Sequence, residues 1–448
     1  MDAAPPLERR AMSPRLSVLI PTFGDAHTLA LTLAALRLQT LDPALFEVVV
    51  VNDGSDPVPY AAVVGAAYPF AFRFESLPEN RGRAAARNRA VALAAGELLC
   101  FLDSDVLAEP PLLERHLAFH DRRDGPAVLI GKRYEGDWAV LAAALEGAPL
   151  THELAGPRHE DFRFRVPGRD ESPQEWLAGA PWVFALTNNV SLPRQAVLDA
   201  GGFDEAYGTR WGFEDTDLAL RVHRVLGDAA FGYDPLAAGF HVPAVRDLAN
   251  LQQDYGVNLE LFRDRHRCLD AELVDLPAPT EVTRKIRHYR QALAACAEHG
   301  VGRLAEVWPV LGAEFGGRAV LWQAFGTDEV PLGERAVTHD HGRPLSESNL
   351  HLLGTWSPYP DGAFEAVVSV DVWRLFEQRE LSRLLRVGLR QAGEVVLVYT
   401  HGPAVKALPA DLPVLTGPEF FASLLRRRYP QTRTEHFGEI TLFRITAA

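Results

Sequence analysis

One short stretch decides the fold: LLCFLDSD, residues 98–105. Its first five residues are all apolar, which is typical of a parallel strand buried on both faces of a sheet. The strand runs directly into two carboxylates, Asp103 and Asp105, separated by a single serine. A buried strand that ends in acidic side chains predicts an open α/β sheet with a ligand site at the carboxyl edge of its strands.

Two further runs of the same kind lie upstream, at residues 16–20 (LSVLI) and 47–51 (EVVVV). Helical patterns separate the three runs, so the series predicts a mainly parallel, Rossmann-like sheet with right-handed crossovers. The first run continues into Pro21, Thr22 and Phe23. Because polar segments follow all three runs, we expect them to meet at one edge of the sheet and to contact a ligand there.

The D-x-D arrangement of Asp103 and Asp105 suits a divalent cation. A hard cation held by one or two carboxylates, with phosphate oxygens in its other positions, stabilises a nucleoside diphosphate leaving group. We expect Asp105 to face the metal. Asp103 is expected to reach the ribose, or the metal through water. The alternative is a solvated turn that binds nothing.

Asp53 and an arginine-rich segment extend this expected donor site. Asp53 follows the second strand, where a carboxylate can accept hydrogen bonds from a base or a ribose, although an Asx turn is the alternative. Residues 79–88 (ENRGRAAARN) place arginines at a helix start. Guanidinium groups bind phosphate bidentately, and a helix N-terminus adds its dipole. We therefore expect Arg81 and Arg87 to contact the donor, with Arg87 facing inward; a solvated basic face is the alternative.

In this order, the motifs PTF, NDGS, ENRGRAAARN and LDSD resemble those of the family-two glycosyltransferases with the GT-A fold. Three later segments extend the resemblance: TNNVS (187–191), GGFDE (201–205) and WGFEDTD (211–217). The last is similar to the W-G-x-E-D motif of one branch of that family. The resemblance covers about residues 15–261.

The resemblance implies an inverting transfer of a sugar from a nucleotide-sugar donor, most often a UDP-sugar, to an acceptor hydroxyl. It implies that Asp215 is the general base and that Glu214 hydrogen-bonds a substrate sugar. Trp211 and Asn189 are expected on the acceptor side. His241 is implied as a further metal ligand beside the D-x-D carboxylates, which favours manganese over magnesium because imidazole suits manganese better.

The residues alone leave alternatives open for these later positions. Glu214 and Asp215 precede an apolar-periodic run, so they also fit the acidic first turn of a helix. A single histidine such as His241 is also a common structural residue. Without the family resemblance, neither segment would identify a site.

The length of 448 residues predicts two domains. We expect a flexible tail at 1–14, the GT-A domain at 15–274, a proline-containing linker at 275–280 and a smaller α/β domain at 281–448. In the last domain, residues 361–373 (DGAFEAVVSVDVW) and 393–399 (GEVVLVY) are similar to the later half of class I methyltransferases, but the glycine-rich loop that would cradle S-adenosylmethionine is missing. We interpret the domain as a methyltransferase-like remnant with a role in acceptor binding, dimerisation or stabilisation.

The composition limits the kinds of binding partner that we expect for this protein. With 45 Lys and Arg against 59 Asp and Glu, the formal net charge is −14, which argues against nucleic acid and anionic membranes as broad electrostatic partners. Three cysteines without CxxC spacing predict neither a disulfide framework nor a zinc site. The sequence shows no signal peptide and no apolar window long enough for a membrane span, so we expect a cytoplasmic protein.

The acceptor is left open: a peptide, a glycan, a lipid-linked intermediate or a small molecule. The alternative function is a non-catalytic nucleotide-sugar-binding scaffold whose C-terminal domain carries the interaction role.

Overall fold

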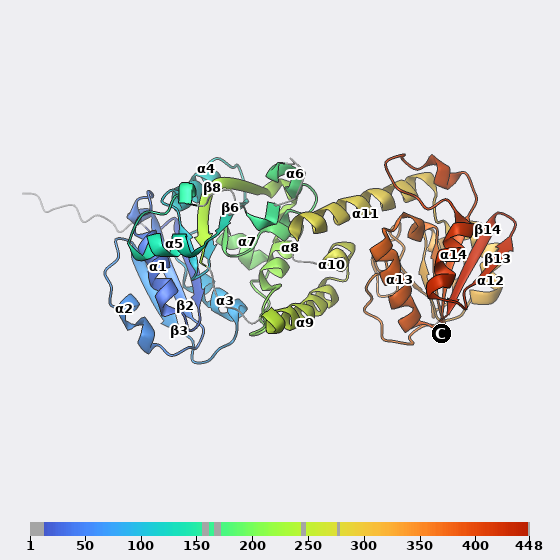
Figure 1. Ribbon diagram of the computed structural model, residues 1–448, viewed down its shortest axis with the longest axis horizontal. Helices are drawn as coiled ribbons and strands as arrows, with labels where there is room; N and C mark the ends of the chain where they lie inside the picture. Colours follow the sequence, from blue (N-terminus) through green and yellow to red (C-terminus); the bar gives the residue numbers. More distant parts are fainter. Residues whose placement is uncertain (1–12, 155–160, 165–171, 243–247, 276–277, 447–448) are drawn as a thin grey trace, which may run out of the picture. The chain divides into compact units, whose positions relative to one another are not determined.

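The structure, a computed structural model, describes residues 13–154, 161–164, 172–242, 248–275 and 278–446. It divides into two compact units (Figure 1): unit 1 holds Met1–Phe262 and Leu276–Thr283, and unit 2 holds Arg263–Asp275 and Arg284–Ala448. Most of the expected tail lies outside the described residues, and so do residues 276 and 277 of the expected linker.

Unit 1 is built on an eight-stranded sheet with the strand order β3-β2-β1-β4-β7-β6-β8-β5. Its strands are β1 (Leu16–Thr22), β2 (Phe46–Asn52), β3 (Ala71–Ser76), β4 (Leu98–Leu102), β5 (Val106–Ala108), β6 (Val128–Glu135), β7 (Asn189–Pro193) and β8 (Phe231–His241). Its α-helices are α1 (Ala26–Leu36), α2 (Ala61–Val64), α3 (Arg83–Leu93), α4 (Leu112–Asp121), α5 (Trp138–Leu145), α6 (Pro173–Leu177), α7 (Arg194–Asp199), α8 (Glu214–Leu226) and α9 (Leu248–His266), whose last residues belong to unit 2.

The apolar runs predicted as strands are β1, β2 and β4, and these predictions are confirmed. These strands and β3 pair in parallel. Every residue of β1 and β2 is buried. Each of these strands has a neighbouring strand on both sides, and helices cover the faces of the sheet. The predicted α/β class with a Rossmann-like parallel sheet is therefore confirmed. Beyond β4 the sheet becomes mixed, since β7 runs antiparallel to both β4 and β6.

The mixed half of the sheet brings distant residues to the end of β4. The short strand β5, which follows the D-x-D segment, pairs antiparallel with β8, so that Val106 lies opposite His241. Strand β6 pairs in parallel with β8 and places Glu135 opposite the same histidine. The backbone N–H of Val242 donates to the carbonyl of Asp105 at 2.8 Å. This register fixes the D-x-D segment against the end of β8.

Unit 2 is a second α/β unit with a six-stranded sheet in the order β10-β9-β11-β12-β14-β13. Its strands are β9 (Val320–Gln323), β10 (Val337–Thr338), β11 (Ala366–Val370), β12 (Glu394–Thr400), β13 (Arg433–Phe437) and β14 (Ile440–Thr446). Its α-helices are α10 (Leu269–Leu273), α11 (Pro279–His299, which starts in unit 1), α12 (Leu304–Phe315), α13 (Gln378–Gln391) and α14 (Pro418–Arg428).

The core of unit 2 has two apolar layers, one on each face of its sheet. Helices α13 and α14 pack on one face, and α12 packs on the other. The first four strands in the sheet order are parallel, and β14 runs antiparallel to both of its neighbours. A smaller α/β C-terminal unit is confirmed; its similarity to methyltransferases remains a prediction.

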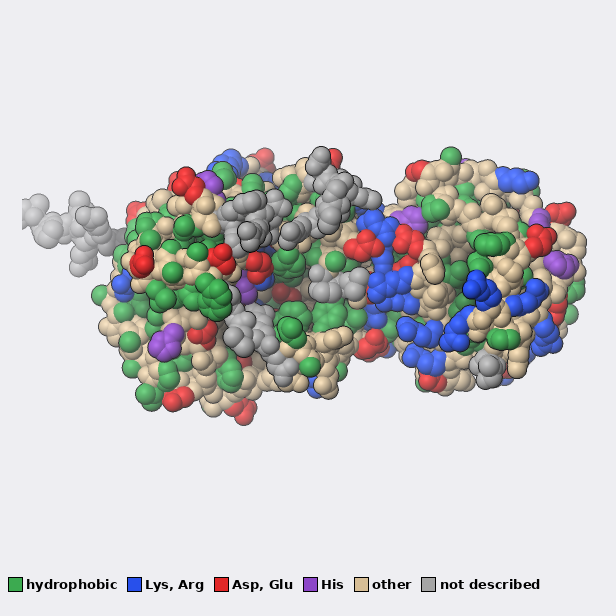
Figure 2. Space-filling model, viewed as in Figure 1, with side chains coloured by type: hydrophobic (Ala, Val, Ile, Leu, Met, Phe, Trp, Pro, Cys, Tyr) green, Lys and Arg blue, Asp and Glu red, His purple; other side chains and the backbone are tan. Residues whose placement is uncertain are grey.

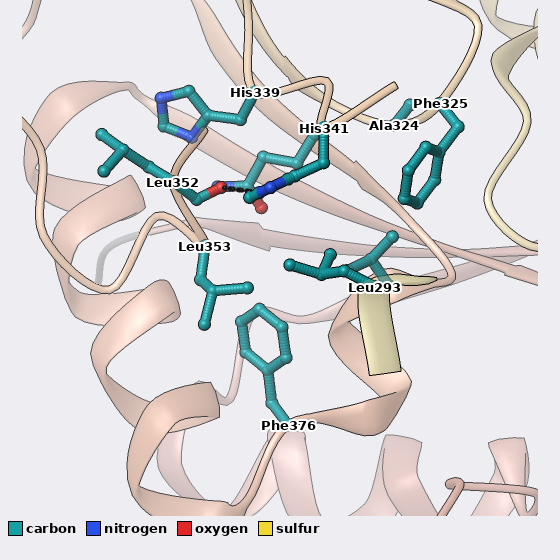
Figure 3. Close-up of a pocket in the computed structure, with 10 residues that line it drawn as sticks. Leu293, Ala324, Phe325, His339, His341, Leu352, Leu353 and Phe376 are labelled. Carbon is teal, nitrogen blue, oxygen red and sulfur yellow. Dashed lines mark hydrogen bonds between the residues drawn. The ribbon is translucent and has the colours of Figure 1, made fainter. Parts of the chain in front are cut away.

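A small cavity lies at the carboxyl ends of β9 and β10. It is lined by Gln323, the last residue of β9, and by His339, which directly follows β10. Figure 3 shows apolar side chains around it, among them Phe325 and Phe376, and the hydrogen bond between Nε2 of His341 and the carbonyl of Leu352. The cavity has room for about one water molecule. The unit's own side chains therefore fill this part of the sheet edge.

The surface of unit 2 is rich in arginine. Figure 2 shows Lys and Arg side chains gathered on its visible face. The exposed arginines of α13 and α14 include Arg379, Arg386, Arg390, Arg426, Arg427 and Arg428. Among the helices of the described residues, none combines the length and apolarity that a membrane crossing requires.

Candidate active site

Pro21 and Thr22 are the last two residues of β1. Pro21 and Thr22 are buried, and Oγ1 of Thr22 lies 3.1 Å from the hydroxyl of Tyr60. The next residue, Phe23, is 55% exposed. The predicted polar segment therefore lies at the carboxyl edge of the sheet, but only the ring of Phe23 offers a substantial exposed surface. A contact between these residues and the donor remains a prediction.

Asp53 binds the loop that opens α3. It is 5% exposed, and its two carboxylate oxygens accept hydrogen bonds from the backbone N–H groups of Arg81 and Gly82, each at 2.9 Å. Burial raises the pKa of Asp53, and the two backbone hydrogen bonds partly offset that rise. Asp53 therefore orders the arginine-containing loop. Its expected contact with a base or ribose remains a prediction.

Arg87 faces inward, as predicted from the sequence, and is 2% exposed. Its Nη1 donates to Oε1 of Glu214 at 2.8 Å, and its Nη2 donates to Oδ1 of Asp103 at 3.0 Å. Burial opposes the charge of this guanidinium, yet the carboxylates of Asp103 and Glu214 raise its pKa. Both ends of the guanidinium fork are occupied by carboxylates, so this geometry gives no support to the expected phosphate contact.

Other residues of the same segment bind the GGFDE motif. Asn88 accepts a hydrogen bond from the N–H of Phe203 at 2.8 Å and donates to its carbonyl at 2.9 Å. The exposed side chain of Arg81 pairs with Glu205 at 2.7 Å. Helix α3 and the loop before it therefore connect to the GGFDE motif. Arg81 has two partners here, Asp53 and Glu205, and both are residues of the protein itself.

The D-x-D segment and the end of β8 form one acidic cluster with a histidine. Nε2 of His241 lies 3.3 Å from Oδ2 of Asp105, and Nδ1 lies 3.5 Å from Oε2 of Glu135. Burial lowers the pKa of His241, but the hydrogen bonds to these two carboxylates outweigh it, so that the net shift is upward. Within the described ranges, no three His, Cys, Asp or Glu residues already converge as a metal site. The structure brings Asp105 and His241 together and turns Asp103 toward Arg87.

The acidic pair of the W-G-x-E-D motif begins helix α8. Glu214 is 6% exposed, and its Oε2 has no hydrogen-bond partner among the described residues. Asp215 is partly buried and accepts a hydrogen bond from the N–H of Thr216 at 2.7 Å. Burial, reinforced by the charge of Glu214 and opposed by that of Arg87, raises the pKa of Asp215 to about 6. A carboxylate with that pKa is suited to general-base chemistry near neutral pH.

Helix α9 fixes the turn before these carboxylates. Asp254 accepts from the N–H of Trp211 at 3.1 Å, and Nδ2 of Asn258 donates to the carbonyl of Gly212 at 2.9 Å. The ring of Phe213 packs against Tyr255, with ring centroids 4.9 Å apart. Trp211 itself is half-buried beside this helix. No motif in the sequence marks these contacts of α9, so its role emerges only from the tertiary structure.

Glu135 was also missed: it is the last residue of β6, VLIGKRYE, and the Lys132 and Arg133 just before it hide the strand from a search for apolar runs. Asn189 is buried within the sheet, opposite Leu102 of β4. It is 0% exposed, its Nδ2 donates to the carbonyls of Lys132 and Ala237, and its Oδ1 accepts from Nε2 of His116 at 2.8 Å. Its amide ties β6, β7 and β8 together, so this geometry gives no support to the expected acceptor contact.

The chain is similar in sequence to known proteins. Residues 17–166 match the model of the family described as "Glycosyl transferase family 2". The uncharacterized glycosyltransferase YfnE of Bacillus subtilis (strain 168) is 28% identical over 315 residues, which cover 61% of this chain and 76% of that protein.

The similarity is longer in a second relative. Validoxylamine A glucosyltransferase of Streptomyces hygroscopicus subsp. limoneus is 29% identical over 392 residues, covering 79% of this chain and 84% of the relative. That share of this chain is larger than unit 1, so the similarity extends into unit 2. Among solved structures, S. aureus TarS 1-349 aligns at 19% identity over 62% of this chain and 72% of that one, with a TM-score of 0.42.

The family match begins within β1 and includes the residues that follow β1, β2 and β4, as well as helix α3. These are the elements that carry Asp53, Arg87 and the D-x-D carboxylates of the site. Residues 17–166 therefore form a domain of glycosyltransferase family 2, and the chain is a glycosyltransferase.

Proposed function

We propose that the protein transfers a hexose or an N-acetylhexosamine from a nucleoside diphosphate sugar to an acceptor hydroxyl, with inversion at the anomeric carbon and with Asp215 as the general base. In this reaction Asp215 removes the proton of the attacking hydroxyl while the bond between the sugar and the diphosphate breaks on the opposite face. The proton ends on the Asp215 carboxylate, and the nucleoside diphosphate leaves.

The observation that carries this proposal is the environment of Asp215. Its carboxylate lies at the start of α8, next to Glu214 and close enough to Arg87 and Asp103 for their charges to act on it. Its raised pKa, about 6, leaves it ionised at neutral pH and still basic enough to take a proton. A positioned general base contributes roughly 10²–10⁴-fold to such a rate.

The residues fit a divalent cation whose coordination the donor completes. Asp105 and His241 supply an oxygen and a nitrogen within contact distance of each other, while Asp103 is committed through one oxygen to Arg87. Cations of this kind are commonly held by one or two protein carboxylates plus substrate phosphates. When bound, the cation would neutralise charge that develops on the leaving diphosphate. The imidazole favours manganese over magnesium as the working ion.

The donor class is proposed on two grounds. Asp105 and Asp103 stand at the carboxyl edge of a parallel sheet, where phosphate-bearing ligands bind in open α/β folds. The relative that matches most of this chain is named a glucosyltransferase, which makes glucose the first hexose to test. A UDP-sugar is the first nucleotide form to test, because the motif order resembles a family that uses such donors most often.

The test is nucleotide release from a panel of UDP-, GDP- and dTDP-sugars with manganese, with magnesium or with a chelator. The native protein is compared with Asp105→Ala, and Asp199→Asn serves as an exposed acidic control. We expect release from one donor in the native protein and in the control, and loss of release with chelator and with Asp105→Ala.

Two results would oppose the proposal. Release that persists in chelator would remove the metal from the mechanism. Nucleotide binding without release from any donor, tested also with candidate peptide, glycan and small-molecule acceptors, would favour the alternative of a non-catalytic nucleotide-sugar-binding scaffold.

A further inference from the structure

Arg87 joins two carboxylates that belong to different motifs. Asp103 directly follows β4 as the first carboxylate of the D-x-D segment, and Glu214 begins helix α8 in the W-G-x-E-D motif. The guanidinium reaches both of them, at 3.0 and 2.8 Å, from the middle of α3. Because Arg87 and Glu214 are both buried, water does not compete for the hydrogen bond between them, whereas the Asp103 end is partly exposed. The expected donor side and the expected acceptor side of the site therefore share one buried cation.

Glu214 is held through one oxygen only. Oε1 receives the hydrogen bond from Arg87, whereas Oε2 is buried and has no partner among the described residues. A buried acceptor without a partner destabilises the protein, and more so when it is charged. A hydroxyl group of a bound sugar is the kind of donor that would satisfy this oxygen.

The backbone before Glu214 is strained in a way that fixes its direction. Phe213 has a φ of 74°, which is an outlier for a bulky residue. Its ring is held by Tyr255 and by Phe262, with centroids 4.9 and 5.2 Å away. Such strain persists only where the surrounding structure enforces it, and it is concentrated at functional sites. The strained turn sets where Glu214 enters the site, and Arg87 sets where its carboxylate points.

We propose that Arg87 is a positioning residue of the transfer reaction: it holds Glu214 so that Oε2 receives a substrate hydroxyl, and it keeps Asp103 in register with Glu214. This inference rests on the proposed function and replaces the phosphate contact expected for Arg87. It assigns a hydroxyl-bearing sugar, either the donor hexose or the acceptor, to the free oxygen of Glu214.

The geometry requires arginine at this position. The planar guanidinium presents two N–H directions at once, whereas an ammonium group is a compact point charge on a flexible stem. Arg87→Lys therefore keeps the positive charge but does not hold both carboxylates in fixed directions. Arg87→Gln removes the charge as well. The two variants separate the alignment of Glu214 from simple charge neutralisation.

The experiment is a double-mutant cycle in the full chain with Arg87→Gln, Glu214→Gln and the double variant, together with Arg87→Lys. Arg89→Gln is the matched control, because Arg89 lies on the same helix and pairs with Glu75 at the surface. Steady-state kcat and KM for the acceptor, donor affinity by calorimetry and the free energy of unfolding are measured for each.

If Arg87 acts through Glu214, the two losses are not additive. We expect each single substitution to lower kcat/KM roughly tenfold or more. The kcat/KM of the double variant should lie no more than about threefold below that of the less active single variant. Arg87→Lys is expected to preserve donor affinity without restoring kcat/KM, and Arg89→Gln to behave as the native protein does.

Additive losses in kcat/KM would overturn the proposal. A loss in Arg87→Gln that is confined to donor affinity, with kcat unchanged, would restore the phosphate contact instead. If the native protein releases no nucleotide from any donor, the proposed function fails separately. The same cycle, measured on the free energy of unfolding, then reports whether Arg87 and Glu214 are coupled, and additivity there would remove the positioning role.

Discussion

Nη1 of Arg87 donates a 2.8 Å hydrogen bond to Oε1 of Glu214, although 127 positions separate the two residues in the chain. The adjacent Asn88 binds the backbone of Phe203, and Asp53 binds the backbone of Arg81 and Gly82. Helix α3 and the loop before it thus contact the NDGS, LDSD, GGFDE and WGFEDTD motifs. The expectations below follow from these contacts.

Replacing Asp215 with Asn is expected to lower kcat by about 10²–10⁴-fold, because the amide cannot accept the proton of the attacking hydroxyl. Donor affinity should stay within about threefold of the native value, since the substitution preserves shape. Kinetics and calorimetry on one preparation check both quantities, and Asp199→Asn is the control. Full activity in the Asp215→Asn variant would exclude Asp215 as the base.

The rate is expected to fall as the pH drops through about 6. Burial raises the pKa of Asp215 to about 6, and only the ionised carboxylate accepts a proton, so the active fraction declines below that value. The check is kcat/KM between pH 5 and 8, with donor affinity measured at each pH to separate binding from chemistry. A rate that stays flat down to pH 5 would mean that the base has an ordinary carboxylate pKa or is another group.

Gly82→Ala is expected to destabilise unit 1 by about 3 kcal/mol or more. Gly82 has a φ of +93°, and an added Cβ would lie 1.8 Å from the carbonyl oxygen of Gly208. Gly24→Ala is the matched control, because Gly24 also has a positive φ, +67°, but has open space around its Cβ position. The control should lose only about 1–2 kcal/mol from backbone strain. Urea unfolding of both variants gives the comparison, and equal losses would show that the contact with Gly208 is not tight.

Acid is expected to destabilise unit 1 between pH 6.5 and 4. Burial lowers the pKa of His116 to about 4, and the same is true of its neighbour His120. Between the unfolded and folded pKa values the unfolded chain binds more protons, so the free energy of unfolding falls as the pH falls through this window. Urea unfolding at several pH values measures the slope. His116→Asn should make it shallower and His27→Asn, an exposed control, should not; an unchanged slope in His116→Asn would contradict the assignment.

S-adenosylmethionine is expected not to bind the protein. The cavity at the carboxyl ends of β9 and β10 has room for about one water molecule, and the apolar side chains around it belong to the core of unit 2. Calorimetry with the full chain is the check, and 5′-deoxyadenosine is a smaller probe of the same edge. Saturable binding of either compound would contradict this expectation and point to a second, methyl-transferring activity.

Sequence alone determined the strands and the edge where polar side chains collect. Apolar runs such as residues 16–20 and 47–51 can only be buried on both faces, so their identity as β1 and β2 follows from local pattern. Asp53 follows β2, and Asp103 and Asp105 follow β4. These carboxylates were predicted as site residues because parallel strands end at one edge of a sheet. The order of the motifs indicated the family, because each motif is a short, contiguous segment that can be recognised in the sequence.

Only the tertiary structure decided what these side chains contact. Arg87 and Asn189 were both expected to bind substrates, yet the first holds two carboxylates and the second is buried among β6, β7 and β8. The left-handed conformation of Phe213 and its clamp by α9 left no signal in the sequence. A hydrogen bond between residues more than a hundred positions apart depends on how elements pack, and local patterns of apolar and polar residues do not carry that information.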